Sequence, residues 1–171
     1  KNQENGLTDF GRQLIKHLNA AKVLVDVAHV NAPGVLEACE LSTAPVIASH
    51  TTAQSIHAHD RGLTDDGLRA IAQTGGVIAV IWSGSFLMGK LDITTDAVVE
   101  HTLRIADICG PDHLAFGSDF DGWIPSIPND IRDCRDIALY TQKLLDAGMS
   151  QAEVSGLLGQ NLMRVLRTIG R

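Results

Sequence analysis

Short apolar stretches alternate along this chain with longer amphipathic ones. The apolar stretches are rich in Val, Ile, Leu and Ala, and few polar residues interrupt them. That composition is typical of strands that are buried on both faces of a parallel sheet. We therefore predict strands at residues 22–28, 45–49, 77–82 and 114–118.

The stretches between these strands have the apolar spacing of amphipathic helices. Thr8 and Thr64 are suited to cap the helices that follow them, and Ser150 and Glu153 have the spacing of a capping box. We predict helices at residues 9–20, 33–41, 65–74, 95–108, 131–147 and 151–168.

Alternation of helices and strands predicts an α/β fold with a parallel sheet and right-handed crossovers. Four strands fit a small doubly wound sheet, and they fit equally well one half of an eight-stranded barrel. Periodicity alone does not choose between the two. A chain of 171 residues suits one domain, so we expect residues 1–171 to form a single domain.

Composition and charge exclude several classes of protein. The net charge of −6 argues against a nucleic-acid partner, because phosphate binding needs a basic face. Three scattered cysteines, without a C-x-x-C pair, indicate neither a disulfide framework nor a cysteine zinc site. No apolar run is long enough to span a membrane. The chain lacks an initial Met, which we interpret as a sign of sequence upstream, so it indicates no compartment.

Polar residues suited to metal chemistry follow three of the four predicted strands. His29 follows the first strand, His50 the second and Asp119 the fourth. Because the carboxyl ends of parallel strands meet at one edge, these side chains are expected to converge there. Two imidazoles can bind one zinc ion, and a carboxylate can bind the metal or carry protons. The pattern predicts a metal site that still lacks a third firm protein ligand.

Other residues have more than one interpretation. We expect His57 and His59 to lie at the surface or in local hydrogen bonds, and we interpret His17, His101 and His113 as structural. Arg61 is either a solvated surface residue or a clamp for a substrate carboxylate. The Pro-rich loop at residues 121–130 is typical of a site loop.

Several segments together resemble the C-terminal half of the renal, or membrane, dipeptidases. They occur in the family's order and spacing, and the similarity extends over essentially the whole chain. They are residues 7–12 (LTDFGR), 25–30 (VDVAHV), 45–50 (PVIASH), 116–122 (FGSDFDG) and, in the final helix, 161–166 (NLMRVL).

This resemblance implies a (β/α)₈ barrel with two zinc ions bridged by a glutamate, and hydrolysis of dipeptides by metal-activated water. It implies that His29 and His50 bind one of the zinc ions. Asp119 corresponds to the acid that handles protons or the substrate amine, and Arg61 to the arginine that meets the substrate carboxylate. Phe86 stands where the family usually has a substrate-contacting Tyr, so a hydroxyl contact is absent.

The family's remaining zinc ligands belong to the other half of the barrel. We therefore expect this chain to hold at most one partial metal site, and to need the N-terminal half as a separate chain or segment. A half-barrel exposes sheet edges, which favours self-association and makes a homodimer possible. Two alternatives remain: an incomplete barrel acting as a binding or structural module, and an amidohydrolase-fold enzyme acting on another amide or a lactone.

Overall fold

A five-stranded parallel sheet forms the centre of the computed structural model, which describes residues 4–170. Strands β1, β2, β4 and β5 lie side by side in that order, and β3 pairs with the end of β2. The strands are β1 (Val25–Asp26), β2 (Val46–Ala53), β3 (Gly62–Leu63), β4 (Ile78–Val80) and β5 (Leu114–Ala115).

Helices connect the strands and continue past the last one. The α-helices are α1 (Asp9–Ala20), α2 (Ala32–Leu41), α3 (Asp65–Gln73), α4 (Gly84–Met88), α5 (Thr95–Cys109), α6 (Ile137–Asp146), α7 (Gln151–Ser155) and α8 (Asn161–Thr168). Two 3₁₀ turns, η1 (Pro111–His113) and η2 (Cys134–Asp136), precede β5 and α6, and a π-helical turn, η3 (Gly156–Gln160), joins α7 to α8. No helix in the described residues is long and apolar enough to cross a membrane.

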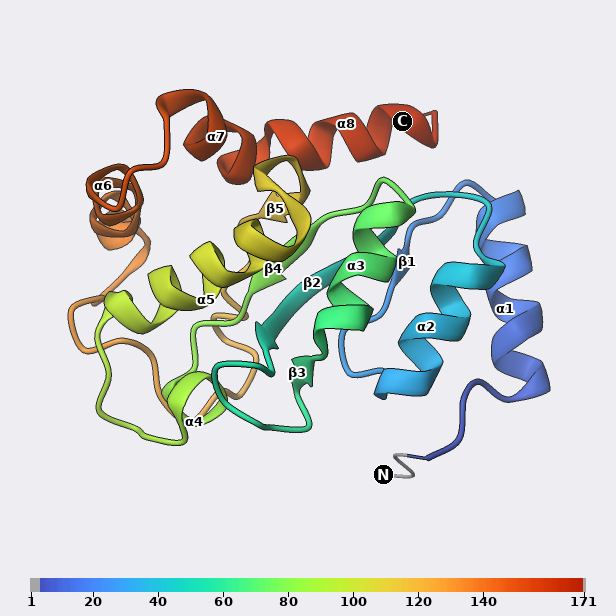
Figure 1. Ribbon diagram of the computed structural model, residues 1–171, viewed down its shortest axis with the longest axis horizontal. Helices are drawn as coiled ribbons and strands as arrows, with labels where there is room; N and C mark the ends of the chain where they lie inside the picture. Colours follow the sequence, from blue (N-terminus) through green and yellow to red (C-terminus); the bar gives the residue numbers. More distant parts are fainter. Residues whose placement is uncertain (1–3, 171) are drawn as a thin grey trace.

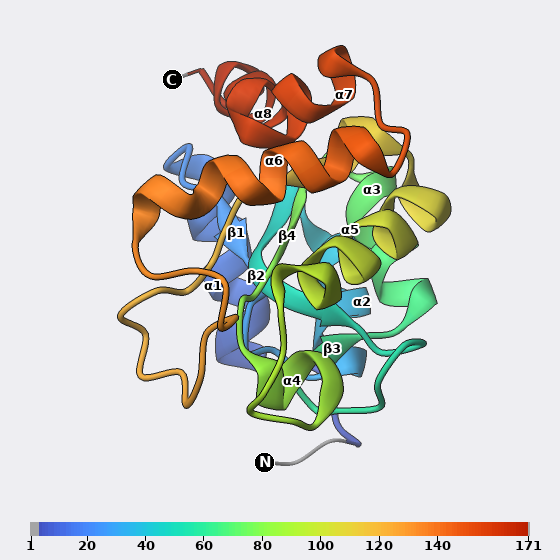
Figure 2. The ribbon, with the colours of Figure 1, turned by 90° about the vertical axis from the view of Figure 1, so that its left-hand side faces the viewer.

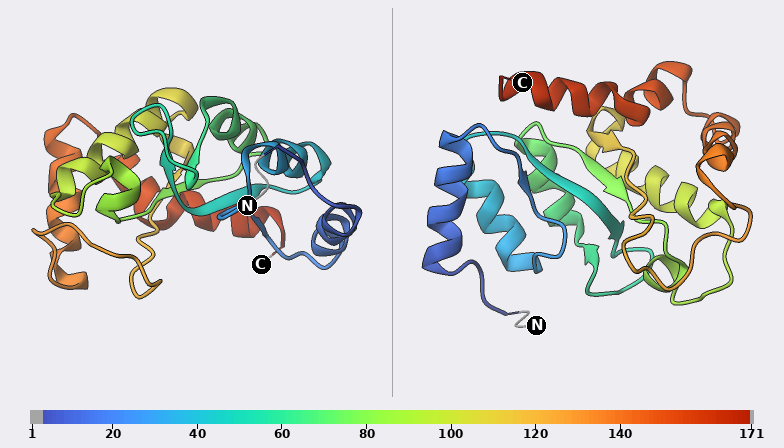
Figure 3. Two further views of the ribbon diagram at one scale, coloured as in Figure 1. Left: turned by 90° about the horizontal axis from the view of Figure 1, so that it is seen from below. Right: turned by 180° about the vertical axis from the view of Figure 1, so that it is seen from behind.

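Only one face of the sheet is covered by helices along its length. Helices α2, α3 and α5 lie over the face that is turned toward the viewer in Figure 1. Seen from behind, the opposite face is open, with α1, α6 and α8 at its margins (Figure 3). Helix α8 lies at one end of the sheet, and α4 and β3 lie at the other (Figure 2).

The hydrophobic core follows this arrangement. The main cluster packs alternate strand residues, such as Val46 and Ile78, against buried residues of the covering helices, such as Leu68 and Ile105. A smaller cluster lies where α8 crosses the amino ends of the strands, listed here by its buried members: Val77, Ala79, Ala115 and Val165. Burial of apolar surface contributes about 25 cal/mol per Å², so the main cluster stabilises the packing of the helices on the sheet. Most of the opposite face of the sheet has no such cover.

The three predicted helix caps agree with the structure. Thr8 accepts a hydrogen bond from the backbone N–H of Gly11, and Thr64 accepts one from Gly67. Ser150 and Glu153 form the reciprocal capping box. Each of these contacts satisfies N–H groups that have no partner inside the helix.

Several predicted boundaries were wrong. The predicted helix at 131–147 begins only at Ile137, after a 3₁₀ turn, and the predicted strand at 114–118 pairs regularly only over Leu114–Ala115. Strand β2 continues to Ala53 instead of ending at residue 49, because its last two residues pair with β3. Neither β3 nor α4 was predicted, since both are shorter than a clear hydrophobic period.

Candidate active site

His29 and His50 meet at the carboxyl ends of β1 and β2. Their Nε2 atoms are 3.0 Å apart, and the rings are arranged edge to face with centroids 5.0 Å apart. His29 is exposed, and the side chain of His50 is 17% exposed. The structure therefore brings together two residues that the sequence placed on consecutive strands.

A bulge in β2 sets the direction of His50. Ala48 pairs with Ile78 and Thr51 pairs with Val80, so β2 has one residue more than β4 across this interval. Bulges re-aim side chains and are common beside active sites. His50 was predicted just after its strand, but it lies inside the strand, at the bulge.

Asp26 links the two histidine-bearing segments. Its Oδ1 accepts hydrogen bonds from the backbone N–H of Ala28, at 3.0 Å, and from that of Ser49, at 3.1 Å. One carboxylate thus holds both the turn that leads to His29 and the bulge that carries His50. This is a structural role, and it is separate from the candidate metal ligands His29 and His50.

Asp119 lies near the Nε2 atom of His50. Its Oδ2 is 3.9 Å from His50 Nε2, and its side chain is 20% exposed. His29 and Asp119 both have left-handed backbone conformations, with φ of 68° and 62°. Such conformations cost about 1–3 kcal/mol each in non-glycine residues and gather at functional sites, where the surrounding structure holds them.

Arg61 and Phe86 lie near the same edge. The Arg61 Cζ is 6.0 Å from the Phe86 ring centroid, and Nη2 donates to the His50 backbone O at 3.4 Å. Desolvation lowers the pKa of Arg61, and the negative charges of Asp119 and Asp26 oppose that shift. A partly buried guanidinium with this environment is suited to an incoming anion.

Comparison with known proteins identifies the family. The model of the membrane dipeptidase family (peptidase family M19) matches residues 1–171. This chain belongs to the membrane dipeptidase family. A protein of Klebsiella pneumoniae, described as an uncharacterized protein in the pqqA 5' region, is 36% identical over 168 residues, covering 96% of this chain and 61% of that protein.

Solved structures of the membrane dipeptidase family have the same fold. A metallo peptidase from Rhodobacter sphaeroides, liganded with a phosphinate mimic of the dipeptide L-Ala-D-Ala, matches with a TM-score of 0.89 and 29% identity, over 96% of this chain and 48% of that one. The dipeptidase AC, a metallo peptidase of family M19, matches with a TM-score of 0.90 and 30% identity, over 98% and 50%.

The chain spans about half to three fifths of the length of these relatives. The half-barrel prediction is therefore confirmed, and the small doubly wound sheet is excluded.

The histidine pair fits a zinc ion as part of a membrane dipeptidase site. Two nitrogens bound to one tetrahedral zinc at 2.0–2.1 Å lie about 3.3 Å apart, close to the observed 3.0 Å. Ser49 Oγ is 2.8 Å from His50 Nδ1, and an Nδ1–H donated to that oxygen leaves Nε2 with its lone pair. Within residues 4–170, no group of three or more His, Cys, Asp or Glu side chains could hold a metal ion. The pair fits, but it is two ligands of a larger set.

Sequence reasoning assigned no part in the site to three residues that shape it. Asp26 and Ser49 lie within or beside predicted strands, and His59 was expected only at the surface or in local contacts. An aspartate in an apolar strand is unusual enough to be a signal for Asp26. His59 Nδ1 accepts from the backbone N–H of Arg61 at 3.0 Å, which is a local hydrogen bond of the predicted kind, but the link to Arg61 itself was not predicted.

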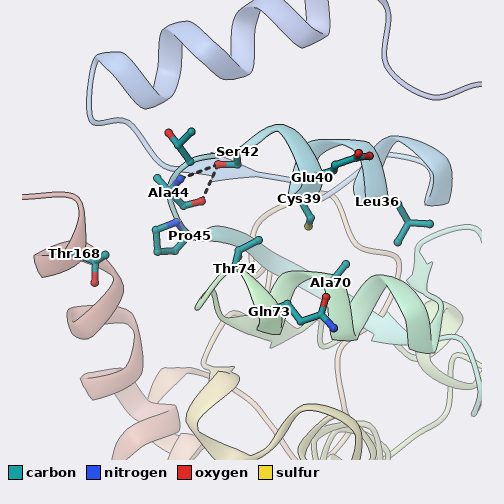
Figure 4. A pocket seen from close by; sticks show the side chains of 11 residues that line it. Leu36, Cys39, Glu40, Ser42, Ala44, Pro45, Ala70, Gln73, Thr74 and Thr168 are labelled. Atoms are coloured by element: carbon teal, nitrogen blue, oxygen red, sulfur yellow. Dashed lines mark hydrogen bonds between the residues drawn. The ribbon is translucent and has the colours of Figure 1, made fainter.

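One pocket lies at the opposite edge of the sheet from the histidine pair. It has a volume of about 600 Å³ and lies between Pro45, Thr74 and Thr168, which mark the start of β2 and the ends of α3 and α8 (Figure 4). Burial raises the pKa of the Cys39 thiol on its wall to about 11, which keeps this thiol protonated at neutral pH. None of the candidate site residues lines this pocket, so it is separate from the histidine pair.

Proposed function

We propose that this chain is the C-terminal half of a zinc-dependent dipeptidase, and that it supplies one zinc-binding pair, a proton carrier and the carboxylate-binding residue of that site. The observation that carries the proposal is the His29–His50 pair, with Nε2 atoms 3.0 Å apart and Asp119 beside them. Membership of a family of metallo-dipeptidases supports it.

In this proposal, His29 and His50 hold one zinc ion through their Nε2 atoms. Bound zinc supplies Lewis acidity and lowers the pKa of water. Asp119 Oδ2, 3.9 Å from His50 Nε2, takes up and releases the proton that moves between the attacking water and the departing amine.

Arg61 binds the C-terminal carboxylate of the dipeptide. Its guanidinium is partly desolvated and lies over the Phe86 ring, so an arriving carboxylate replaces lost hydration by a charge-assisted contact. Phe86 offers a ring face and no hydroxyl, so it orients the substrate by packing. The dipeptide mimic bound to the Rhodobacter sphaeroides relative supports a dipeptide substrate.

The second half of the site comes, in this proposal, from an N-terminal half-barrel, either a segment of the same polypeptide or a second chain. Relatives about twice as long support this, and so does the open face of the sheet. On α1, Phe10 is 74% exposed and Leu14 is 44% exposed, as expected of a helix whose neighbour lies outside this chain.

Hydrolysis assays on the full-length protein test this function. We expect turnover of free dipeptides that a zinc chelator abolishes, and a large rise in KM in Arg61→Ala but not in Arg69→Ala, an exposed arginine on α3. An incomplete barrel that acts as a binding module predicts no turnover when zinc is supplied. An amidohydrolase acting on a lactone or on amides without a carboxylate predicts turnover that Arg61→Ala leaves unchanged.

A further inference from the structure

The segment that carries Arg61 is held at three points. The Arg61 backbone O accepts from Thr51 Oγ1 at 3.0 Å, and its backbone N–H donates to His59 Nδ1 at 3.0 Å. The next residue, Gly62, is the first residue of β3; its N–H donates to the His59 O at 2.8 Å, and it pairs with Thr52 of β2. Both backbone groups of Arg61 thus have partners, and His59 provides one of them through its side chain.

His59 forms a side-chain turn with Arg61. A side-chain acceptor at one residue and a backbone donor two residues later reproduce the geometry of an Asx turn, which fixes the intervening backbone. The contact requires that Nδ1 carry no proton, so the ring is the neutral tautomer with its proton on Nε2. Asparagine forms the same turn naturally, and phenylalanine does not.

The same imidazole also touches the ring beneath the guanidinium. The His59 and Phe86 ring centroids are 5.0 Å apart, and the Arg61 Cζ is 6.0 Å from the Phe86 centroid. His57 also stacks with His59, with centroids 6.3 Å apart. His59 therefore contacts the Arg61 backbone with one atom, and its ring is tilted by 49° against the Phe86 ring.

We propose that His59 is a positioning residue that sets the affinity for the substrate carboxylate by fixing Arg61 over Phe86. The proposal rests on the proposed function of Arg61 and adds the residue that controls it. His59 itself contacts no reacting atom, so its loss should weaken binding in the ground state and the transition state equally. That change raises KM and leaves kcat in place.

Two variants distinguish the contribution of the Nδ1 acceptor of His59 from that of its aromatic ring. His59→Phe keeps an aromatic ring against Phe86 and lacks the acceptor, whereas His59→Asn keeps the acceptor and lacks the ring. In the full-length zinc-loaded protein, we expect His59→Phe to raise KM for a free dipeptide about tenfold with kcat within about twofold, and His59→Asn to stay within about threefold of wild type in both constants.

Making His59→Phe in a protein that already carries Arg61→Ala shows whether His59 acts through Arg61. There we expect His59→Phe to add less than about twofold to KM, because the residue that it positions is gone. Equal effects of the Phe and Asn variants would overturn the proposal, as would a His59→Phe effect that persists undiminished without Arg61. A wild-type protein that hydrolyses dipeptides while His59→Phe has no effect refutes the positioning role alone, whereas no turnover by wild type refutes the proposed function and, with it, this proposal.

Discussion

The placement of Asp119 beside His50 depends on a glycine that carries no chemistry. A Cβ added to Gly117 would lie 2.0 Å from the Ser49 backbone O and 2.8 Å from the Ala79 Cβ. The chain after β5 therefore runs directly against the bulge in β2 that aims His50. Only a residue without a side chain permits this approach, so Gly117 allows the chain that carries Asp119 to lie close to the segment that carries His50.

Gly117→Ala is expected to destabilise the protein by about 1–3 kcal/mol, because the backbone must move away from Ser49. The same movement separates Asp119 from His50 and should lower kcat for dipeptide hydrolysis. Urea unfolding and steady-state kinetics measure the two effects. Gly11→Ala is the matched control, since its Cβ would meet its nearest neighbour at 3.4 Å, and equal behaviour of the two variants would contradict this account.

Burial of His101 predicts a pH dependence of stability. The side chain is fully buried, with Nδ1 accepting from the Ala53 N–H and Nε2 donating to the Leu87 O, in agreement with its predicted structural role. Desolvation lowers the pKa of His101 to about 4, the Leu87 contact opposes this, and the nearby His57 adds to it. The unfolded chain titrates near the ordinary value of about 6.5, so between about pH 6.5 and about pH 4 it binds the proton and the folded state does not.

The free energy of unfolding should therefore fall by about 3 kcal/mol from His101 alone as the pH is lowered through that window. Urea unfolding of the full-length protein at several pH values measures this slope. His101→Gln cannot titrate, so its curve should be flatter than that of wild type, although the variant is less stable overall. Parallel curves for the two proteins would show that His101 is not the source.

At the scale of elements, contacts close in sequence were predictable and distant pairings were not. The caps at Thr8, Thr64 and Ser150 depend on residues three positions away, so the sequence alone placed these helix starts. The β2 bulge depends on β4, and β3 exists only because β2 continues past His50. Candidate residues at strand ends were therefore found, whereas the features that aim them, such as Asp26 and His59, required the three-dimensional arrangement.

The loop after Asp119 is anchored at its far end by Asp130. The Asp130 Oδ1 accepts from the Thr95 N–H at 2.8 Å and from its hydroxyl at 2.7 Å, and Oδ2 accepts from Lys143 Nζ at 3.3 Å. Burial would raise the pKa of Asp130, but these hydrogen bonds outweigh it and hold the pKa below its ordinary value. One carboxylate thus connects the loop to the start of α5 and to α6.

Asp130→Ala should cost about 1–3 kcal/mol, since it leaves the buried Thr95 without its acceptor. It should also increase proteolytic cleavage within residues 119–130, because the loop loses its far anchor. Urea unfolding and limited proteolysis followed by mass spectrometry measure these effects. Asp107→Ala, which removes an exposed partner of Arg104, should do neither. Cleavage at an unchanged rate in Asp130→Ala would refute the anchoring role.

For the whole molecule, the uncovered sheet face and the exposed side of α1 predict how the chain behaves alone. An apolar half-barrel that lacks its other half exposes surface that a closed barrel buries. We expect residues 1–171, expressed alone, to self-associate and to bind a hydrophobic dye, and the same residues together with the proposed N-terminal half-barrel to do neither. Size-exclusion chromatography with light scattering measures the difference, and a monodisperse, dye-free monomer of the chain alone would contradict the prediction.

The zinc content of the full-length protein tests the central claim most directly. We expect about two zinc ions per molecule of wild type, as in a two-metal hydrolytic site. The control variant His17→Ala, which changes an exposed histidine of α1, should bind the same number. His29→Ala and His50→Ala should each lose about one zinc ion, because each removes half of the pair that holds it. Unchanged zinc content in both variants would show that His29 and His50 do not bind the metal, and the proposed site would be wrong.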